Sequence, residues 1–148
     1  MNITLPDGSI RELVKGSTGF DLANDIGPGL AKAAIAVNVN GVQKDLCDPI
    51  EEDSNVSIIT IDSDEGLEIM RHTITAQVLA KAIKRLYPQS KLAIGPTIED
   101  GFYYDFLSDK PISSEDLPKI ENEMRNIIDS GDVITKSFVS KIVAFKTF

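Results

Sequence analysis

The sequence predicts an α+β protein made of two successive domains. Short alternating apolar segments, separated by Gly, Pro and Asp turn signals, occupy residues 1–62, as in a small sheet. A long helical repeat of apolar residues begins near Leu67, and the polar, turn-prone stretch 62–66 lies between the two patterns. We therefore expect one domain over residues 1–62 and a second over residues 63–148.

The first domain is expected to be a ubiquitin-like β-grasp roll, in which a sheet wraps one helix. Asp7-Gly8 lies between β-prone segments at 2–5 and 10–14, and this pair is a strong hairpin signal because Gly accepts a positive φ. Ser17 or Thr18 is the expected N-cap of the helix that follows. Hairpin, helix and further strands in this order are typical of a β-grasp.

The remainder of this domain completes the roll. The helix is expected to end at residue 26, with Phe20, Leu22 and Ala23 facing the core. One more helical turn is predicted at 30–34. The sheet is completed by predicted strands over residues 36–40, 42–46 and 56–61.

The second domain is predicted to contain two main helices. The first runs from residue 67 to 87, because apolar residues recur at helical spacing until Pro88. The second covers residues 115–129, after a Ser-Ser-Glu-Asp start signal. The residues expected to form the buried stripe of this second helix are Leu117, Ile120, Met124, Ile127 and Ile128.

Strands are predicted around these helices. Phe102, Tyr104 and Phe106 alternate with polar neighbours, as expected for one strand with an aromatic face. Residues 133–138 are predicted as a further strand, and residues 141–148 as the beginning of another helix. The second domain is therefore expected to be α+β.

The charge of the chain is acidic overall but uneven. The formal net charge is −8; residues 1–62 carry 4 Lys/Arg and 10 Asp/Glu, and residues 63–148 carry 11 and 13. This charge disfavours DNA as a partner of the whole surface. The segment 72–91 contains no acidic residue, and its cations are Lys81, Lys84, Arg85 and Lys91. We expect these four residues to contact the phosphates of a polyanionic partner.

Other features bear on compartment and cofactors. No apolar run approaches the roughly 20 residues that span a bilayer, so no membrane partner is expected. The single Cys47 allows no internal disulfide and fits the reducing cytoplasm. No metal site is expected, because Cys47 and His72 are the only soft ligands and lie in different predicted domains.

Several segments of the sequence resemble those of a known family. Residues 1–62 resemble a TGS domain, with Leu-Pro-Asp-Gly-Ser at 5–9 and Gly-Leu-Ala-Lys-Ala-Ala at 29–34. The second half is similar to the start of the editing domain of bacterial threonine–tRNA ligases. The phrases that carry this similarity are Met-Arg-His-Thr at 70–73, Ala-Lys-Ala-Ile-Lys-Arg-Leu-Tyr-Pro at 80–88, Ala-Ile-Gly-Pro at 93–96 and Gly-Phe-Tyr-Tyr-Asp at 101–105. The resemblance implies a TGS domain followed by the first part of an editing-like domain.

The resemblance also implies candidate site residues. In the family, the pocket that clears misattached serine is built around His-x-x-x-His on the first helix, where side chains at i and i+4 lie about 40° apart. Counting back from the matched 82–84 places these positions at Thr73 and Gln77. His72 precedes them, about 140° from Gln77 on a continuous α-helix. His72, Gln77 and Tyr104, which occupies the family's aromatic position, are the candidate catalytic residues, and Thr73 is a candidate substrate-binding residue.

The resemblance further implies what this chain would lack. The full ligase would use ATP and zinc, whereas no cofactor is expected in this chain. The Cys-x-x-x-His element that completes the family's editing site would lie beyond residue 148. Because Gln77 cannot accept a proton as histidine does, we expect the chain alone to be inactive in editing.

Three functions stay open at this point. The first is an N-terminal region of a threonine–tRNA ligase that binds the acceptor end of tRNA for proofreading, without the aminoacylation core. The second is a freestanding TGS module that binds RNA or protein. The third is a trans-editing esterase that acts on seryl-tRNA.

The C-terminal segment predicts self-association. Several apolar residues there would lack cover if the editing-like domain is incomplete: Phe138, Val143, Phe145 and Phe148. An exposed apolar patch of a few hundred Å² favours association. A homodimer, or a frayed tail beyond about residue 136, is therefore expected.

Overall fold

The computed structural model describes residues 1–147, and the chain divides into two compact units. The first unit consists of Met1–Thr75 and Gly95–Tyr104; the second consists of Ala76–Ile94 and the chain from Asp105 onward. This division differs from the boundary expected at residues 62–63, because the start of the long helix and the segment Gly95–Tyr104 make their contacts within the first unit. That 1–62 and 63–148 fold independently stays a prediction.

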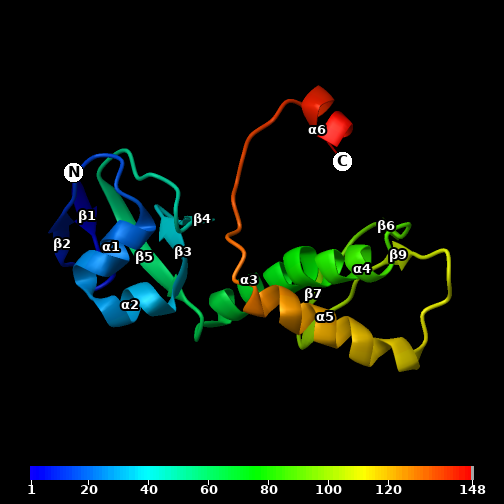
Figure 1. Cartoon of the computed structure of the whole chain (residues 1–148). Helices are drawn as coiled ribbons and strands as arrows, with labels where there is room; N and C mark the ends of the chain where they lie inside the picture. The colour runs from blue at the N-terminus through cyan, green and yellow to red at the C-terminus, as the bar shows by residue number, and fades with distance from the viewer. Residues whose placement is uncertain (148) are drawn as a thin grey trace. The chain divides into compact units, whose positions relative to one another are not determined.

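The first unit contains a five-stranded sheet in the order β2-β1-β5-β3-β4 (Figure 1). The strands are β1 (Asn2–Thr4), β2 (Ile10–Glu12), β3 (Ala34–Val39), β4 (Val42–Asp45) and β5 (Ser54–Thr60). β1 and β5 run parallel at the centre, and all other neighbours are antiparallel. This topology confirms the predicted β-grasp roll.

Two helices accompany the sheet, α1 (Gly19–Ile26) and α2 (Pro28–Ala33). α1 begins with a capping box in which Thr18 and Asp21 each bond to the other's backbone N–H. Leu22 and Ala23 are fully buried, as predicted, but Phe20 is 46% exposed, which corrects its assignment to the core. Phe20 lies about 200° around the helix from Leu22, so both cannot face the same sheet.

The core of the sheet and the β3–β4 turn follow from sequence pattern. Ile3, Leu22 and Val37 are fully buried in a cluster that joins β1, α1 and β3. Asn40 and Gly41 have φ of 52° and 83°, as a two-residue hairpin turn requires. The alternation of apolar residues therefore predicted both the strands and the face that they bury.

The long helical region is not one regular helix. It consists of α3 (Asp64–Thr73), a π-helical segment η1 (Ile74–Leu79) and α4 (Ala80–Leu86). The predicted start at residue 67 is late, because the helix begins behind a polar N-cap, Ser63, whose side chain accepts a hydrogen bond from Gly66 N. The π-helical turn has no signature in the apolar spacing, and the sequence pattern therefore missed it.

The aromatic segment 101–106 forms two short strands and not the single strand that was predicted. β8 (Gly101–Phe102) pairs with β7 (Thr97–Ile98) in the first unit, and β9 (Phe106–Leu107) pairs with β6 (Lys91–Leu92) in the second. The predicted alternation of burial still holds, since Tyr104 is half-buried and Tyr103 is 50% exposed.

The second helix of the second unit is α5 (Leu117–Asp129), preceded by a 3-10 turn, η2 (Ser114–Asp116). α5 packs against α4, and the two helices lie side by side in Figure 1. Ile120 and Ile127 are buried, whereas Leu117 and Ile128 are 58% and 57% exposed, which corrects the predicted stripe. α4 covers only part of the apolar face of α5, and the apolar residues at the edge of that face stay exposed.

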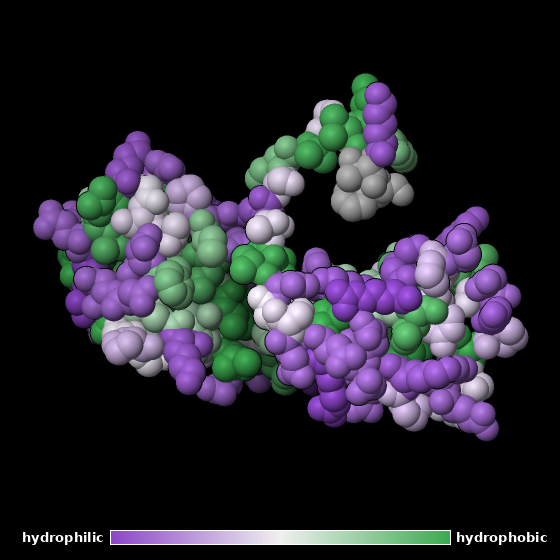
Figure 2. Space-filling model, in the orientation of Figure 1, coloured by the Kyte–Doolittle hydropathy of each residue, from purple (hydrophilic) through white to green (hydrophobic). Residues whose placement is uncertain are grey.

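The C-terminal segment departs further from the prediction. Residues 133–138 form no strand, because no neighbouring strand among the described residues pairs with them. The predicted final helix is present as α6 (Lys141–Thr147). Phe138 and Phe145 are 93% and 77% exposed, and hydrophobic residues run along this segment in Figure 2. Phe148 lies outside the described residues.

Within the described residues, no helix is both long and apolar enough to cross a lipid bilayer.

Candidate functional site

A polar hollow of about 380 Å³ on the first unit brings together His72 and Thr73. Its lining consists of Glu68, Ile69, His72 and Thr73 of α3, Thr97 of β7 and Gln43 of β4. The four helix residues stand at i, i+1, i+4 and i+5, and therefore share one face of α3. The Thr73 hydroxyl donates to the Ile69 carbonyl at 2.9 Å, which leaves its oxygen available as an acceptor.

The start of α3 is fixed closely against the end of β5. Ser63 Oγ donates to the Thr60 carbonyl at 2.8 Å and accepts from Gly66 N at 3.0 Å. A Cβ on Gly66 would lie 1.9 Å from the Thr60 carbonyl oxygen, so only glycine fits here. This corner determines where α3 presents Glu68 and His72.

A second contact holds the β7–β8 hairpin on α3. Arg71 Nη1 donates to the Glu99 carbonyl at 2.7 Å, and Glu99 lies in the turn between the two strands. The bond places Thr97 of β7 at the hollow. Sequence reasoning missed Thr97 and Gln43, because their approach to α3 depends on tertiary packing. It also missed Glu68, although its i, i+4 spacing from His72 was a readable signal.

Tyr104 lies at the other end of the same hairpin segment and packs on the backbone of Gly95. A Cβ on Gly95 would lie 2.3 Å from Tyr104 Cδ2 and 2.5 Å from Thr75 Cγ2. Thr75 is fully buried in the π-helical segment, and its hydroxyl donates to the Arg71 carbonyl at 2.7 Å. Tyr104 thus has a packing role beside the helix, and it is not among the residues that line the hollow around His72.

The structure does not bring the three candidate catalytic residues into one hollow. His72 is exposed at the hollow on the first unit, whereas Gln77 lines a different one with Lys81 and Asp132. The angle of about 140° expected between His72 and Gln77 assumed a continuous α-helix. The π-helical segment, whose wider i→i+5 turn rotates less per residue, removes that assumption.

Three of the four candidate phosphate-binding cations already have partners. Lys81 pairs with Asp132, Arg85 Nη1 lies 2.8 Å from Glu123 Oε1, and Lys84 Nζ donates to the carbonyls of Pro88 and Ser90 at 2.7 and 3.0 Å. Lys91 is exposed. Ion pairs of this exposed kind contribute about 0–1 kcal/mol, so phosphates can compete for them.

The two ion pairs lower the pKa values of their carboxyl groups. The hydrogen bond from Lys81 holds the pKa of Asp132 below its usual value. The hydrogen bond from Arg85 does the same for the pKa of Glu123. Both carboxylates therefore remain charged at neutral pH and reduce the positive field of the segment 72–91.

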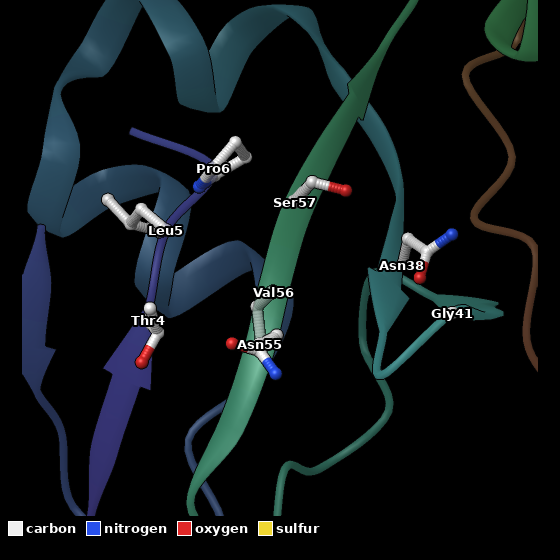
Figure 3. Close-up of a pocket in the computed structure, with 8 residues that line it drawn as sticks. All are labelled: Thr4, Leu5, Pro6, Asn38, Gly41, Asn55, Val56 and Ser57. Atoms are coloured by element: carbon white, nitrogen blue, oxygen red, sulfur yellow. The ribbon is translucent and has the colours of Figure 1, made fainter. Parts of the chain in front are cut away.

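A further hollow of about 330 Å³ lies on the sheet itself (Figure 3). Thr4 stands opposite Asn55 in the β1–β5 ladder, and Asn38 stands opposite Ser57 in the β3–β5 ladder. These side chains are neutral. No group of three or more His, Cys, Asp or Glu residues that could hold a metal ion occurs in the part of the chain that the structure describes.

Comparison with known proteins defines the family context. The TGS domain family model matches residues 1–60. The threonine–tRNA ligase of Paramagnetospirillum magneticum is 48% identical over 147 residues, which are 99% of this chain and 23% of the ligase. Threonine–tRNA ligase 1 of Bacillus subtilis is 50% identical over 141 residues, 95% of this chain and 22% of the ligase. The threonine–tRNA ligase of Acetivibrio thermocellus is 53% identical over 128 residues, 86% of this chain and 20% of the ligase.

The chain thus spans about a fifth of the length of the curated relatives that it matches. The β-grasp topology of the first unit agrees with the match to the TGS family, and the similarity to the ligases continues through the second unit. Residues 1–60 match the TGS domain family, and the chain as a whole is similar in sequence to the N-terminal region of threonine–tRNA ligases.

Proposed function

We propose that this chain serves as the part of a threonine–tRNA ligase that receives the acceptor end of tRNA for proofreading. The observation that carries the proposal is the identity of 48–50% over nearly the whole chain to threonine–tRNA ligases. The region would act in the cytoplasm. ATP and zinc would serve the remainder of such a ligase.

The hollow around His72 supports this function. It is large enough for a small polar group and presents an imidazole, a carboxylate, an amide and two hydroxyls from three elements. His72 can act as a base or position a water molecule, whereas Gln77, which lines another hollow, cannot accept a proton. We therefore expect binding of the acceptor end without hydrolysis by this chain alone.

The charge distribution supports weak tRNA binding. Lys81 and Arg85 must exchange a carboxylate partner for phosphate, and Lys84 must leave two carbonyls, so Lys91 is the cation with the lowest cost of recruitment. Binding based on a few phosphate contacts has a dissociation constant on the order of 10⁻⁴ to 10⁻⁶ M and weakens as salt rises.

Titration of fluorescent tRNA at several salt concentrations tests the proposal. Binding should weaken with salt, and Lys91→Ala should reduce the log–log slope by about 0.7–0.9. Lys32→Ala, an exposed lysine of α2, is the matched control and should leave the slope unchanged. Absence of salt-sensitive binding contradicts the proposal; equal binding by the Lys91 variant favours a TGS module that uses another surface.

Hydrolysis is tested separately with seryl-tRNA. The purified chain should release serine no faster than buffer does. Release above that rate, abolished by His72→Ala and retained in Lys32→Ala, would support the trans-editing alternative instead.

A further inference from the structure

The hollow around His72 carries one anionic side chain and no cationic lysine or arginine among its described lining residues. Glu68 supplies the negative charge, and Arg71, the nearest cation along α3, is bonded to the Glu99 carbonyl at 2.7 Å. The other polar groups are the imidazole of His72, the hydroxyls of Thr73 and Thr97 and the amide of Gln43. The hollow therefore favours a ligand that bears a positive charge and uncharged hydrogen-bonding groups.

Glu68 and His72 are placed to act on one small ligand. They stand at i and i+4 on α3, a spacing that brings side chains within about 5–6 Å at their Cβ atoms. A carboxylate accepts hydrogen bonds from an ammonium group, and neutral imidazole or hydroxyl groups can bond a carbonyl or hydroxyl nearby. The pair therefore matches a ligand in which an ammonium group lies close to a neutral carbonyl.

This charge pattern separates two forms of an amino acid. A free amino acid has a carboxylate next to its ammonium group, and that carboxylate would meet Glu68 without a cation to offset it. An aminoacyl ester has the same ammonium group but an uncharged carbonyl. The hollow is thus suited to the esterified form.

We propose that Glu68 is a specificity-determining residue that binds the ammonium group of an aminoacyl ester and so excludes free amino acids from the hollow. The inference rests on the proposed function, because the 3′ end of a charged tRNA presents such an ester. Exclusion of the free amino acid would keep the hollow open to its ester in a cell, where free amino acids are abundant competitors.

The test uses L-serinamide in place of the ester. This compound resists hydrolysis and has a free ammonium group next to a neutral carbonyl. Its binding to the full chain is followed by amide chemical shifts on α3 and β7 at about pH 7, below the usual pKa of an α-ammonium group. L-Serine and N-acetyl-L-serinamide are the comparison ligands. We expect each to bind at least about 10-fold more weakly than L-serinamide. N-acetyl-L-serinamide loses the charged hydrogen bond to Glu68, and the carboxylate of L-serine is repelled by Glu68.

The variants isolate the carboxylate. Glu68→Gln, which keeps the size of an exposed side chain, should weaken L-serinamide binding by about 10-fold or more and leave L-serine binding unchanged or improved. Glu65→Gln, an exposed residue of the first turn of α3 outside the hollow, should bind like the unmodified chain. Circular dichroism confirms that each variant is folded.

Three outcomes would overturn the inference: L-serine binding as tightly as L-serinamide, Glu68→Gln binding like the unmodified chain, or no shift changes with L-serinamide. The salt-sensitive tRNA titration separates this failure from failure of the proposed function. If tRNA still binds, only the role of Glu68 is wrong; if neither tRNA nor L-serinamide binds, both proposals fail.

Discussion

Gly95 shows how one residue without a side chain determines the position of an aromatic ring. The Tyr104 ring and the Thr75 methyl group occupy the space where a Cβ of residue 95 would lie, at 2.3 and 2.5 Å. Thr75 is itself fully buried and bonded to the Arg71 carbonyl. The ring therefore cannot retreat toward the helix, and its place depends on the glycine.

Gly95→Ala should consequently destabilise the fold by about 1–3 kcal/mol, the usual cost of forcing an extra group into a packed site. Urea denaturation of the purified variant measures this. Gly101→Ala is the matched control in the same segment, since a Cβ there meets no atom within 4 Å, and it should be neutral or slightly stabilising. Equal stability of the Gly95 variant and the unmodified chain would show that Tyr104 is not held as described.

Asp21 gives a prediction about pH. The backbone N–H and the hydroxyl of Thr18 donate to its carboxylate, both at 2.8 Å, and these bonds hold the pKa of Asp21 below its usual value of 3.8. Because the pKa is lower in the folded state, the stabilisation is fully present above the unfolded pKa and disappears as pH falls through the folded one.

The stability difference between the unmodified chain and Asp21→Asn should therefore be constant near neutral pH and shrink below about pH 4. Thermal unfolding followed between neutral and acidic pH measures the difference. Asp62→Asn, an exposed carboxylate outside any helix, is the control and should show no such trend attributable to a cap. A difference that grows toward acid would contradict the capping role.

At the scale of elements, the connection between β5 and α3 is a close-packed corner. The sequence pattern alone predicts a polar linker at 62–66. In the structure, Ser63 bonds to the Thr60 carbonyl and to Gly66 N, and Gly66 packs against that carbonyl. The corner thus sets the direction in which α3 leaves the sheet and the place of the hollow around His72.

Gly66→Ala should cost at least about 2 kcal/mol, because the neighbouring atom is a backbone carbonyl that cannot turn aside as a flexible side chain does. The free energy of unfolding in urea measures the loss. Gly29→Ala on α2, where a Cβ meets nothing within 4 Å, should instead be neutral or stabilising. A Gly66 variant as stable as the Gly29 variant would show that the corner is adaptable.

At the scale of the whole molecule, the C-terminal segment offers the apolar surface expected to cause self-association. Val133, Phe138 and Phe145 are 85%, 93% and 77% exposed. Large apolar side chains in this density favour contact between copies of the chain. The homodimer stays a prediction that follows from this surface.

Sedimentation velocity at increasing protein concentration tests it. The unmodified chain should shift toward dimer, and the double variant Phe138→Ser and Phe145→Ser should remain monomeric over the same range. Ser137→Ala, in the same exposed segment, controls for a change in that part of the chain. A strict monomer at all concentrations would refute the expectation.

The sequence by itself determined the β-grasp roll, because alternation of apolar residues and turn pairs such as Asp7-Gly8 are local properties. The family resemblance supplied His72, Gln77 and Tyr104 as candidate catalytic residues, and of these three only His72 lines the hollow that also holds Thr73. Only the tertiary structure decided three further features: the π-helical turn, the split of the aromatic segment into two ladders, and the approach of Thr97 and Gln43 to His72. These depend on contacts between residues distant in sequence, which no local periodicity records.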